Sequence, residues 1–284
     1  MSVSIAVKPQ SADERLSDKN FQLLSGYIYN YSGIKMPQTK MTMLEGRLRR
    51  RVRATGLQGF NDYCDYLFKH GGLEAESVYL IDAVTTNKTD FFREPNHFTY
   101  LEQVILPEFK ASGLRRIRAW SSACSTGAEP YTMAMVLAEY AEKGGPDYSI
   151  LATDLSTEVL LKARSGIYQA ELLKPVAPDL MAKYVMQAVD RTRHDVRITP
   201  SLRAKVGFGR LNLMDQSYQV GEPMHLIFCR NVLIYFDKKT QSHVLTQLCK
   251  HLAPGGYLFI GHSESVTGID LPVRQVANTI FRKD

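Results

Sequence analysis

The first third of the chain has the hydrophobic periodicity of short helices. Apolar side chains recur at steps of three and four residues in two stripes, one of Phe21, Leu24, Ile28 and Tyr31 and one of Leu44, Leu48 and Val52. Gly33, Gly56 and the pair Gly71-Gly72 separate these segments as turn or cap positions. We therefore expect an all-α domain of three or four helices over residues 16–86, preceded by a flexible tail at 1–15.

From Arg116 onward the pattern changes to alternating strands and helices. Apolar runs indicate strands at residues 117–122, 148–153, 205–209, 226–229 and 257–261, with helices at 129–143, 157–164 and 238–252. Such alternation predicts an α/β domain with a mostly parallel sheet covered on both faces. The stretch 273–282 could add one strand at the edge of that sheet.

The alternation breaks between Ser165 and Arg203. This stretch contains three prolines, a predicted helix at 179–185 and a strand-like run at 195–199. It is much longer than a usual α/β connection of about two to six residues. An inserted subdomain is the better interpretation.

Composition narrows the class of protein. No run approaches the roughly 18 apolar residues of a membrane helix, and the first 13 residues lack the apolar core of a secretory signal, so we expect a cytoplasmic protein. The four cysteines form no CxxC pair and the seven histidines show no HxxxH spacing, so neither a disulfide framework nor a metal site is expected. A net charge of +6 is equally compatible with binding to nucleic acid, with binding to an anionic protein surface and with the absence of either partner. No coiled-coil heptads stand out, so we expect a monomer.

The first predicted strand leads into a loop of small residues, 121–128, followed by Glu129 and Pro130. Ligands of an open parallel sheet bind beyond the carboxyl ends of its strands. This loop lacks GxGxxG, which disfavours a dinucleotide. Glu129 would repel phosphates and suits an ammonium group, as in S-adenosylmethionine (SAM), although an ordinary polar turn would look the same.

The second predicted strand ends at Asp154, where a carboxylate can accept hydrogen bonds from both hydroxyls of a ribose. The plain alternative is that Asp154 caps the helix beginning near Ser156. Asn212 and Leu213 end the next candidate strand, where they could contact a nucleoside base. The strand after that leads into 229–236, which lacks the Asn- or Asp-Pro-Pro-Tyr run of many amine methyltransferases.

Six segments together resemble the bacterial chemotaxis-receptor glutamate methyltransferases, the CheR family. They are residues 86–93 (TNKTDFFR), 120–131, 152–154, 162–168, 228–237 and the pieces 254–256 and 261–264, and they follow the family's order over about residues 15–284. The resemblance implies a helical N-terminal domain and a Rossmann-like class I methyltransferase domain at 87–284, with a small β-subdomain inserted near 166–204. It also implies a cofactor site lined by Asn87, Thr89, Arg93, Glu129, Asp154, Asn212, Leu213, Arg230 and Asn231.

The implied reaction is transfer of the SAM methyl group to glutamates on the cytoplasmic helices of chemoreceptors, leaving S-adenosylhomocysteine (SAH). Glutamate has an ordinary pKa of about 4.3 and is already ionised at neutral pH, so no general base is required. The resemblance places Arg93 and Tyr235 near the reacting methyl group as catalytic positioning residues. Without it, Arg93 would pass for a surface ion pair and Tyr235 for a core ring. Family members differ in whether the insertion also binds a receptor C-terminal peptide, and this insertion does not decide that.

A basic run, residues 47–53, lies on the second predicted helix. Leu44, Leu48 and Val52 make its buried stripe, while arginines project elsewhere. A basic helix could bind the glutamate-bearing helices of a receptor, although such runs are usually only a solvated face. The docking candidates are Arg47, Arg49, Arg50 and Arg53.

Two other functions stay open. A methyltransferase of RNA or of a small metabolite could use the basic helix for phosphate contacts, but no RNA-binding module is recognisable, so no nucleic-acid partner and no direct membrane contact is expected. The second open function is that of a non-catalytic module that binds SAM as a signal. Trp120 and Cys124 are interpreted as packing residues rather than as a stacking platform and a nucleophile.

Overall fold

The computed structural model describes residues 15–190 and 192–284, so the tail expected at 1–15 lies outside the described residues except for Arg15. The chain divides into two compact units, and the division falls between Thr85 and Thr86. Each unit is treated by itself below. Within the described ranges, every helix is too short or too polar to cross a membrane.

The first unit is helical over its described residues. Its elements are α1 (Asp18–Ser32), η1 (Gln38–Lys40), α2 (Met41–Ala54), α3 (Phe60–Lys69) and α4 (Leu73–Val84). Ser17 caps the start of α1 by accepting a hydrogen bond from the backbone of Asn20. Gly33 ends α1 with φ at 73°, a left-handed conformation that favours glycine.

The predicted apolar stripes form the core of this unit. The second stripe, Leu44, Leu48 and Val52, is buried along α2, as predicted. Of the first stripe, Phe21, Leu24 and Ile28 are buried, but Tyr31 is only half-buried and stacks on Tyr27 at the helix surface. The helix that this periodicity predicts is confirmed, since α1 contains all four residues.

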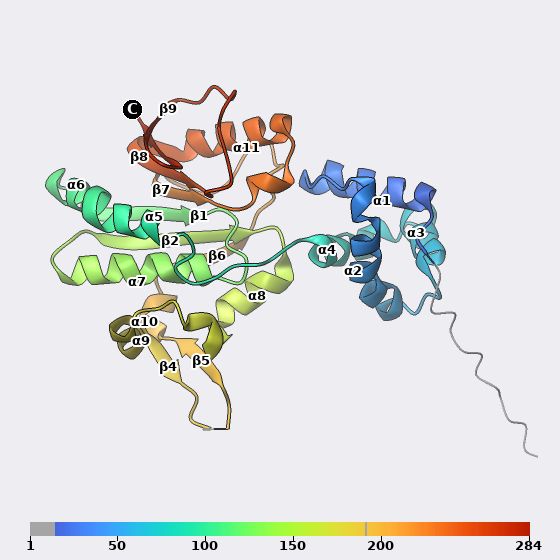
Figure 1. Cartoon of the computed structure of the whole chain (residues 1–284), viewed down its shortest axis with the longest axis horizontal. Helices are drawn as coiled ribbons and strands as arrows, with labels where there is room; N and C mark the ends of the chain where they lie inside the picture. The colour runs from blue at the N-terminus through green and yellow to red at the C-terminus, as the bar shows by residue number, and fades with distance from the viewer. Residues whose placement is uncertain (1–14, 191) are drawn as a thin grey trace, which may run out of the picture. The chain divides into compact units, whose positions relative to one another are not determined.

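The second unit is built on a seven-stranded mixed sheet (Figure 1). The strand order is β6-β2-β1-β7-β8-β10-β9. The first five strands are parallel to one another, β10 pairs antiparallel with β8, and β9 pairs antiparallel with β10. The strands are β1 (Arg116–Ser121), β2 (Asp147–Asp154), β6 (Val206–Arg210), β7 (Met224–Cys229), β8 (Leu252–Ile260), β9 (Val273–Ala277) and β10 (Ile280–Lys283). The predicted α/β class is therefore confirmed.

Helices cover both faces of this sheet, and α7 and α11 lie on opposite faces in Figure 1. The helices of this layer are α5 (Pro95–Tyr100), the π-helical η2 (Leu101–Ile105), α6 (Leu106–Ala111), α7 (Ala128–Glu142), α8 (Thr157–Ser165) and α11 (Lys238–His251). The helices at residues 95–111 were not predicted, although the buried residues Phe98, Leu101, Ile105 and Phe109 recur there at steps of three and four.

The break in alternation contains a small second sheet. Strands β3 (Ile167–Gln169), β5 (Asp195–Ile198) and β4 (Val185–Gln187) pair antiparallel in that order. They are accompanied by η3 (Ala170–Leu173), α9 (Pro178–Tyr184) and α10 (Pro200–Arg203). β3 and β4 were not predicted, because three residues are too few to show an alternating pattern.

The C-terminal stretch forms two strands rather than the one predicted. β10 pairs with β8 and β9 pairs with β10, and the chain turns between them at Thr279, whose φ is 56°. The prediction missed the turn because Asn278-Thr279 is a weak turn signal beside Asn-Gly or Asp-Gly.

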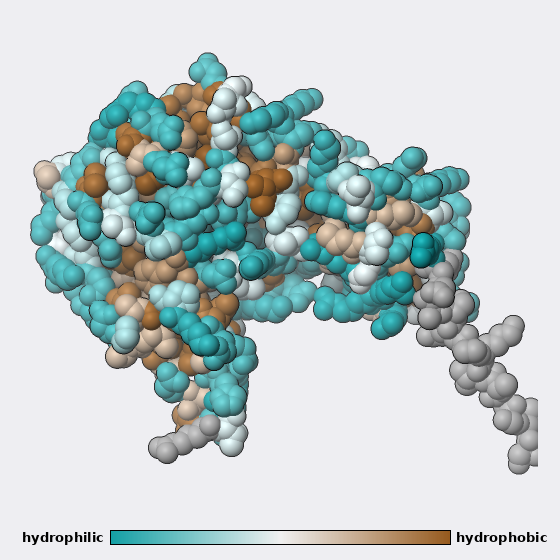
Figure 2. All heavy atoms as spheres, viewed as in Figure 1, coloured by the Kyte–Doolittle hydropathy of each residue, from teal (hydrophilic) through white to brown (hydrophobic). Residues whose placement is uncertain are grey.

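The sheet order fixes where a ligand can bind. The chain runs from β1 outward through β2 to β6 and then returns to β7 on the other side of β1. This switch in direction lies at the carboxyl ends of β1 and β7, where open α/β sheets bind their ligands. On the face shown in Figure 2, the hydrophobic areas are interrupted by hydrophilic side chains, in keeping with an apolar core that lies inside the layers.

Candidate active site

Backbone hydrogen bonds attach the loop after β1 to the strand on each side of it, β7 and β2. The Ser122 amide donates to the Phe228 carbonyl of β7, and the Cys124 amide donates to the Thr153 carbonyl of β2. Gly127 has φ at 94°, and a Cβ there would lie 2.8 Å from the Tyr168 hydroxyl and 2.9 Å from the Ala163 Cβ. Only glycine fits this position, so the loop can turn into α7 while its backbone stays packed against Tyr168 and Ala163.

Asp154 lies where the sequence placed it, at the end of β2. Its Oδ2 accepts a hydrogen bond from the Ser125 amide at 2.8 Å, and its Oδ1 accepts one from the Ser156 amide at 2.9 Å. The helix that follows, α8, is capped by Ser156, whose hydroxyl accepts from Val159. Ser156 is therefore the N-cap of α8, and the half-buried Asp154 carboxylate lies between the loop after β1 and the start of that helix.

The segment 86–93 lies against the same loop. The Ser125 hydroxyl donates to the Asn87 carbonyl at 2.7 Å, and the Phe92 amide donates to the Thr132 hydroxyl at 3.1 Å. Thr89 and Arg93 are half-buried, and Arg93 donates to the Lys88 carbonyl. The structure thus brings Asn87 to the loop beyond β1 and Phe92 to α7, across sequence separations of 38 and 40 residues.

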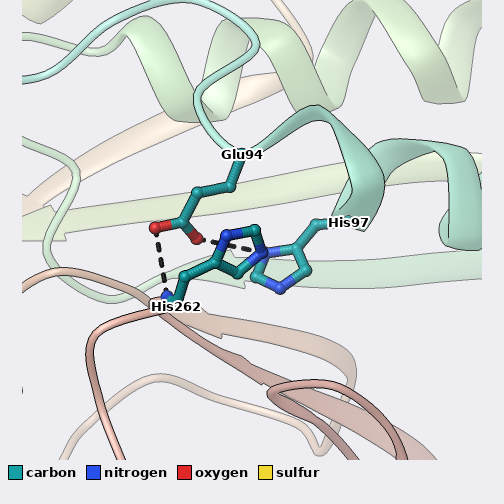
Figure 3. Close-up of side chains that lie close together, drawn as sticks. All are labelled: Glu94, His97 and His262. Atoms are coloured by element: carbon teal, nitrogen blue, oxygen red, sulfur yellow. Dashed lines mark hydrogen bonds and ion pairs between the residues drawn. The ribbon is translucent and has the colours of Figure 1, made fainter.

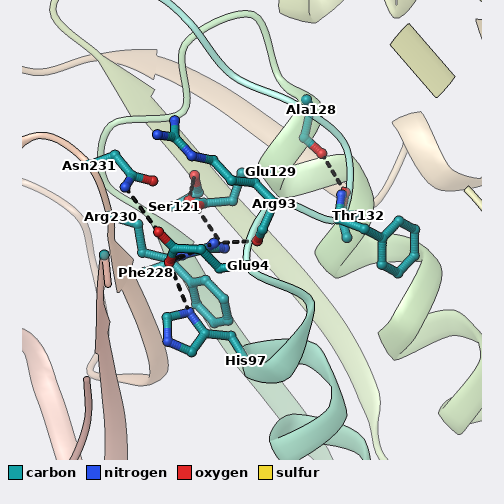
Figure 4. Close-up of polar contacts among 12 residues, drawn as sticks. Arg93, Glu94, His97, Ser121, Ala128, Glu129, Thr132, Phe228, Arg230 and Asn231 are labelled. Carbon is teal, nitrogen blue, oxygen red and sulfur yellow. Dashed lines mark hydrogen bonds and ion pairs between the residues drawn. The ribbon is translucent and has the colours of Figure 1, made fainter. Parts of the chain in front are cut away.

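A buried ion network lies beneath these segments (Figure 4). The Arg230 side chain is 1% exposed, and its Nε and Nη2 donate to Glu94 Oε2 at 3.3 and 3.1 Å. Its Nη2 also donates to the Arg93 carbonyl, and its Nη1 lies 3.4 Å from Glu129 Oε2. Glu129 Oε1 accepts from the Ser121 hydroxyl at 2.7 Å. One guanidinium is therefore shared by two carboxylates, those of Glu94 and Glu129.

The pKa values of these two carboxyls are shifted in opposite directions. Burial raises the pKa of Glu129, in spite of the Arg230 guanidinium and the Ser121 hydroxyl, which act the other way. Burial alone would also raise the pKa of Glu94, but hydrogen bonds from Asn231, the Arg230 charge and the His262 amide together lower it. Glu94 is thus the carboxylate that Arg230 neutralises more completely.

The loop after β7 is shaped by a third carboxylate. Glu264, 8% exposed, accepts hydrogen bonds from the amides of Gly261, Asn231, Leu233 and Ile234. Asn231 has φ at 59°, a left-handed conformation that this carboxylate and Glu94 maintain from two sides. The loop ends in η4 (Leu233–Tyr235), so the half-buried Tyr235 is carried on a segment fixed by Glu264.

Asn212 and Leu213 follow β6. Asn212 is half-buried and its Oδ1 accepts from the Met214 amide, while Leu213 is buried at 7% exposure. The pair therefore offers the polar and the apolar contact that the sequence suggested at the end of this strand.

Both parts of the chain match one family. The all-α domain of the CheR methyltransferases matches residues 19–85, and their SAM-binding domain matches residues 87–281. The chain belongs to the CheR family. The resemblance, the fold class and the cofactor predicted from sequence are confirmed.

Curated CheR relatives match over most of the chain. The chemotaxis protein methyltransferase of Escherichia coli (strain K12) is 40% identical over 268 residues, which cover 94% of this chain and 91% of that protein. The one of Salmonella typhimurium is 40% identical and covers 89% and 86% of the two chains. The one of Borreliella burgdorferi is 39% identical and covers 85% and 86%.

Glu94, His97 and His262 of this CheR protein bring possible metal-ligand atoms within 4.8 Å of one another (Figure 3). The Glu94 carboxylate, however, already accepts from Arg230, from Asn231 and from the His262 amide. A divalent cation there would face the buried guanidinium of Arg230, so we assign no metal to this cluster.

Trp120 and Cys124 are packing residues, as predicted. Trp120 is fully buried and its indole N–H donates to the Thr153 hydroxyl at 2.9 Å. Cys124 is buried, and burial raises the pKa of its thiol well above the usual range, which is the opposite of an activated nucleophile.

The basic helix α2 divides its arginines between two environments. Arg47 donates to the carbonyls of Val84 and Thr85 at the end of α4, so its guanidinium serves the helical unit itself. The docking role of Arg47 stays a prediction, and the structure shows its Nη1 engaged by these two carbonyls. The other three docking candidates are exposed: Arg49, Arg50 and Arg53.

Sequence reasoning missed two carboxylates of the CheR site, Glu94 and Glu264. Glu94 follows directly on the quoted segment 86–93, and Glu264 ends the quoted segment 261–264. Position in a motif was the only available signal. Nothing local indicates that these side chains accept hydrogen bonds from a loop more than 30 residues away.

Proposed function

We propose that this CheR protein acts in the cytoplasm and methylates glutamate side chains on the cytoplasmic helices of chemoreceptors, forming glutamyl methyl esters. The family match supports a SAM-dependent methyltransferase, and the relatives are named chemotaxis protein methyltransferases. The observation that carries the proposal is a buried network of two carboxylates and one guanidinium at the switch point of the sheet. It suits a cationic cofactor, and an ionised glutamate acceptor needs no base to remove a proton.

The proposed cofactor site uses residues from four strand ends. SAM supplies a methyl group on a sulfonium, which an anionic oxygen can attack directly. Asp154 would accept from the ribose hydroxyls, Glu129 from the ammonium group, and Asn212 and Leu213 would contact the base. Asn87 and Thr89 would close the site from the segment before α5. Arg230 would affect the cofactor through Glu94 and Glu129, because its own donors are occupied by these carboxylates and by the Arg93 carbonyl. Asn231 would affect the cofactor through the loop that it shapes.

The protein's contribution to the methyl transfer would be alignment. A receptor glutamate is ionised at neutral pH, and positioning of two reactants can lower a barrier by about 7 to 11 kcal/mol. We propose that Tyr235 orients the incoming carboxylate with one hydrogen bond and that Arg93 holds either that carboxylate or the carboxylate of the cofactor. A tight bidentate grip on the nucleophile would lower its reactivity, so a looser contact is expected.

The proposed acceptor is recognised by charge. Arg49, Arg50 and Arg53 are exposed on α2, and receptor methylation helices carry glutamates that a basic surface attracts. This proposal concerns a receptor helix rather than RNA. The sequence contains no recognisable RNA-binding module, whereas the exposed arginines of α2 match the charge of a glutamate-bearing helix.

The test is transfer of a labelled methyl group from SAM to membranes that contain the chemoreceptors, followed by mild alkali. Esters release labelled methanol under alkali, whereas methyl groups on nitrogen stay attached. Alkali-labile label on the receptors is the expected result. Alkali-stable label would contradict carboxyl methylation, and binding of SAM without any transfer to any receptor would favour a non-catalytic SAM-binding module.

A further inference from the structure

Glu94 is placed to control the charge of the cofactor site although it is not among the residues proposed to touch the cofactor. Its side chain is 12% exposed and accepts hydrogen bonds from the Arg230 guanidinium, the Asn231 side chain and the His262 amide. Its backbone has φ at 57°, a left-handed conformation that costs a glutamate of order 1 kcal/mol or more. The surrounding contacts hold it there, which indicates a position fixed by the fold.

The charges in this network do not cancel. The carboxylates of Glu94 and Glu129 share the single guanidinium of Arg230, which leaves a formal net charge of −1 in a buried place. The neighbouring His97 is neutral, since burial and Arg230 lower its pKa to about 4. The charge of Arg93 also acts on Glu129, but its guanidinium is half-buried, donates to the Lys88 carbonyl and compensates Glu129 less than Arg230 does.

A buried excess of negative charge is unfavourable unless a cation arrives. Arg230 lies closer to Glu94 than to Glu129, at 3.1 Å against 3.4 Å, and it makes two hydrogen bonds to Glu94. Glu94 therefore shares the guanidinium, and Glu129 is only partly compensated. Without the charge of Glu94, Arg230 and Glu129 would form a neutral pair, and the excess negative charge of this network would be lost.

We propose that Glu94 is a positioning residue that selects for the positive charge of SAM by sharing Arg230 with Glu129, so that the guanidinium compensates Glu129 only in part. SAM carries an ammonium, a sulfonium and a carboxylate, so its net charge is positive. SAH keeps the ammonium and the carboxylate and is a zwitterion. Methylthioadenosine has the same nucleoside and no charged amino-acid part. The proposal rests on the proposed cofactor site and is independent of which acceptor is methylated.

The test compares the affinities of these three ligands for wild type and Glu94→Gln by calorimetry. SAM binding should weaken by about tenfold to thirtyfold, as expected for one unit charge removed within a partly buried network. SAH should lose less, and methylthioadenosine should bind within about twofold of wild type. Equal losses for all three ligands would show a general disruption of the site and overturn the proposal, as would unchanged SAM affinity.

Two further variants separate charge from shape. Glu94→Asp keeps the charge and shortens the side chain, so the ratio of SAM to methylthioadenosine affinity should stay near that of wild type even if the protein is less stable. Glu76→Gln is the matched control, because it breaks a similar pair with Arg51 inside the helical unit and should leave all three affinities unchanged. Trp120 fluorescence, which reports on the methyltransferase unit, verifies that the Glu94 variants are folded, and circular dichroism verifies the helical unit of Glu76→Gln. These binding measurements need no receptor, so a failure of receptor methylation would not affect them.

Discussion

Acidification should destabilise the methyltransferase unit through His97. This side chain is buried, and its Nε2 lies 2.8 Å from the Thr279 hydroxyl, which itself donates to the Asn278 carbonyl. The hydroxyl must therefore accept from Nε2–H, and the other ring nitrogen, Nδ1, has no hydrogen-bond partner. Burial first and the Arg230 charge second lower the pKa of His97 from 6.5 to about 4.

The direction of the effect follows from proton binding. Below about pH 6.5 the unfolded chain takes up a proton at this histidine, and the folded unit does not until the pH falls to about 4. The stability that neutral His97 contributes is thus present above pH 6.5 and is lost progressively as the pH falls toward 4. Between about pH 7.5 and about pH 5 this one group should lower the free energy of unfolding by roughly 2 kcal/mol.

Trp120 makes the measurement specific. It is the single tryptophan of the chain and is fully buried in the methyltransferase unit, so its fluorescence follows the unfolding of that unit by urea. Measured at both pH values, wild type should lose stability on acidification and His97→Gln should lose roughly 2 kcal/mol less, because glutamine can still donate to Thr279 but does not titrate. Burial also lowers the pKa of His225 and of His251, but these groups are present in both proteins and cancel in the comparison.

The exposed His194 provides the control, and His194→Gln should keep the full pH dependence of wild type. Equal pH dependence in wild type and His97→Gln would refute the reasoning, since it would mean that His97 is not held neutral in the folded unit. Glu94 does not interfere at pH 5, because its pKa is lowered from 4.5 and it stays ionised there.

Three other outcomes are expected. Asp154→Asn should weaken SAM binding about tenfold or more in calorimetry, because an amide is a poorer acceptor for ribose hydroxyls; unchanged affinity would exclude Asp154 from the site. Tyr235→Phe and Arg93→Ala should each lower kcat about tenfold or more, as expected for lost alignment, with a smaller effect of Tyr235→Phe on SAM affinity; wild-type rates of receptor methylation would refute both roles. Reversal of the exposed charges on α2, by changing Arg49, Arg50 and Arg53 to Glu, should raise the apparent KM for receptor and reduce its salt dependence. An unchanged KM would show that the basic helix does not bind the acceptor.

Local patterns in the sequence determined most of the framework. The stripe of Leu44, Leu48 and Val52 identified the core face of α2, and alternating apolar segments identified the parallel strands of the large sheet. These signals are readable because helix and strand periodicities depend only on neighbours in sequence. The same holds for Asp154 and Glu129, which follow directly on strands whose carboxyl ends must meet at the switch point.

The sequence left undecided everything that depends on pairing across the fold. Arg47 and Arg51 look like Arg49 and Arg50 in the basic run, but the structure ties Arg47 to the end of α4 and Arg51 to Glu76. The exposed or buried state of a charged side chain depends on which distant element packs beside it, and periodicity along one helix cannot give that.

Only the tertiary structure decided the electrostatics of the site. Arg230 and Glu94 are 136 residues apart, and the amides that Glu264 accepts from lie in a loop about 30 residues before it. Neither contact leaves a local trace in the sequence, because the energy of a buried charge depends on its neighbours in space and on the water that the fold excludes. The sequence by itself determined which residues reach the end of the sheet, and the packing of distant segments determined which of them are charged, paired and available to a ligand.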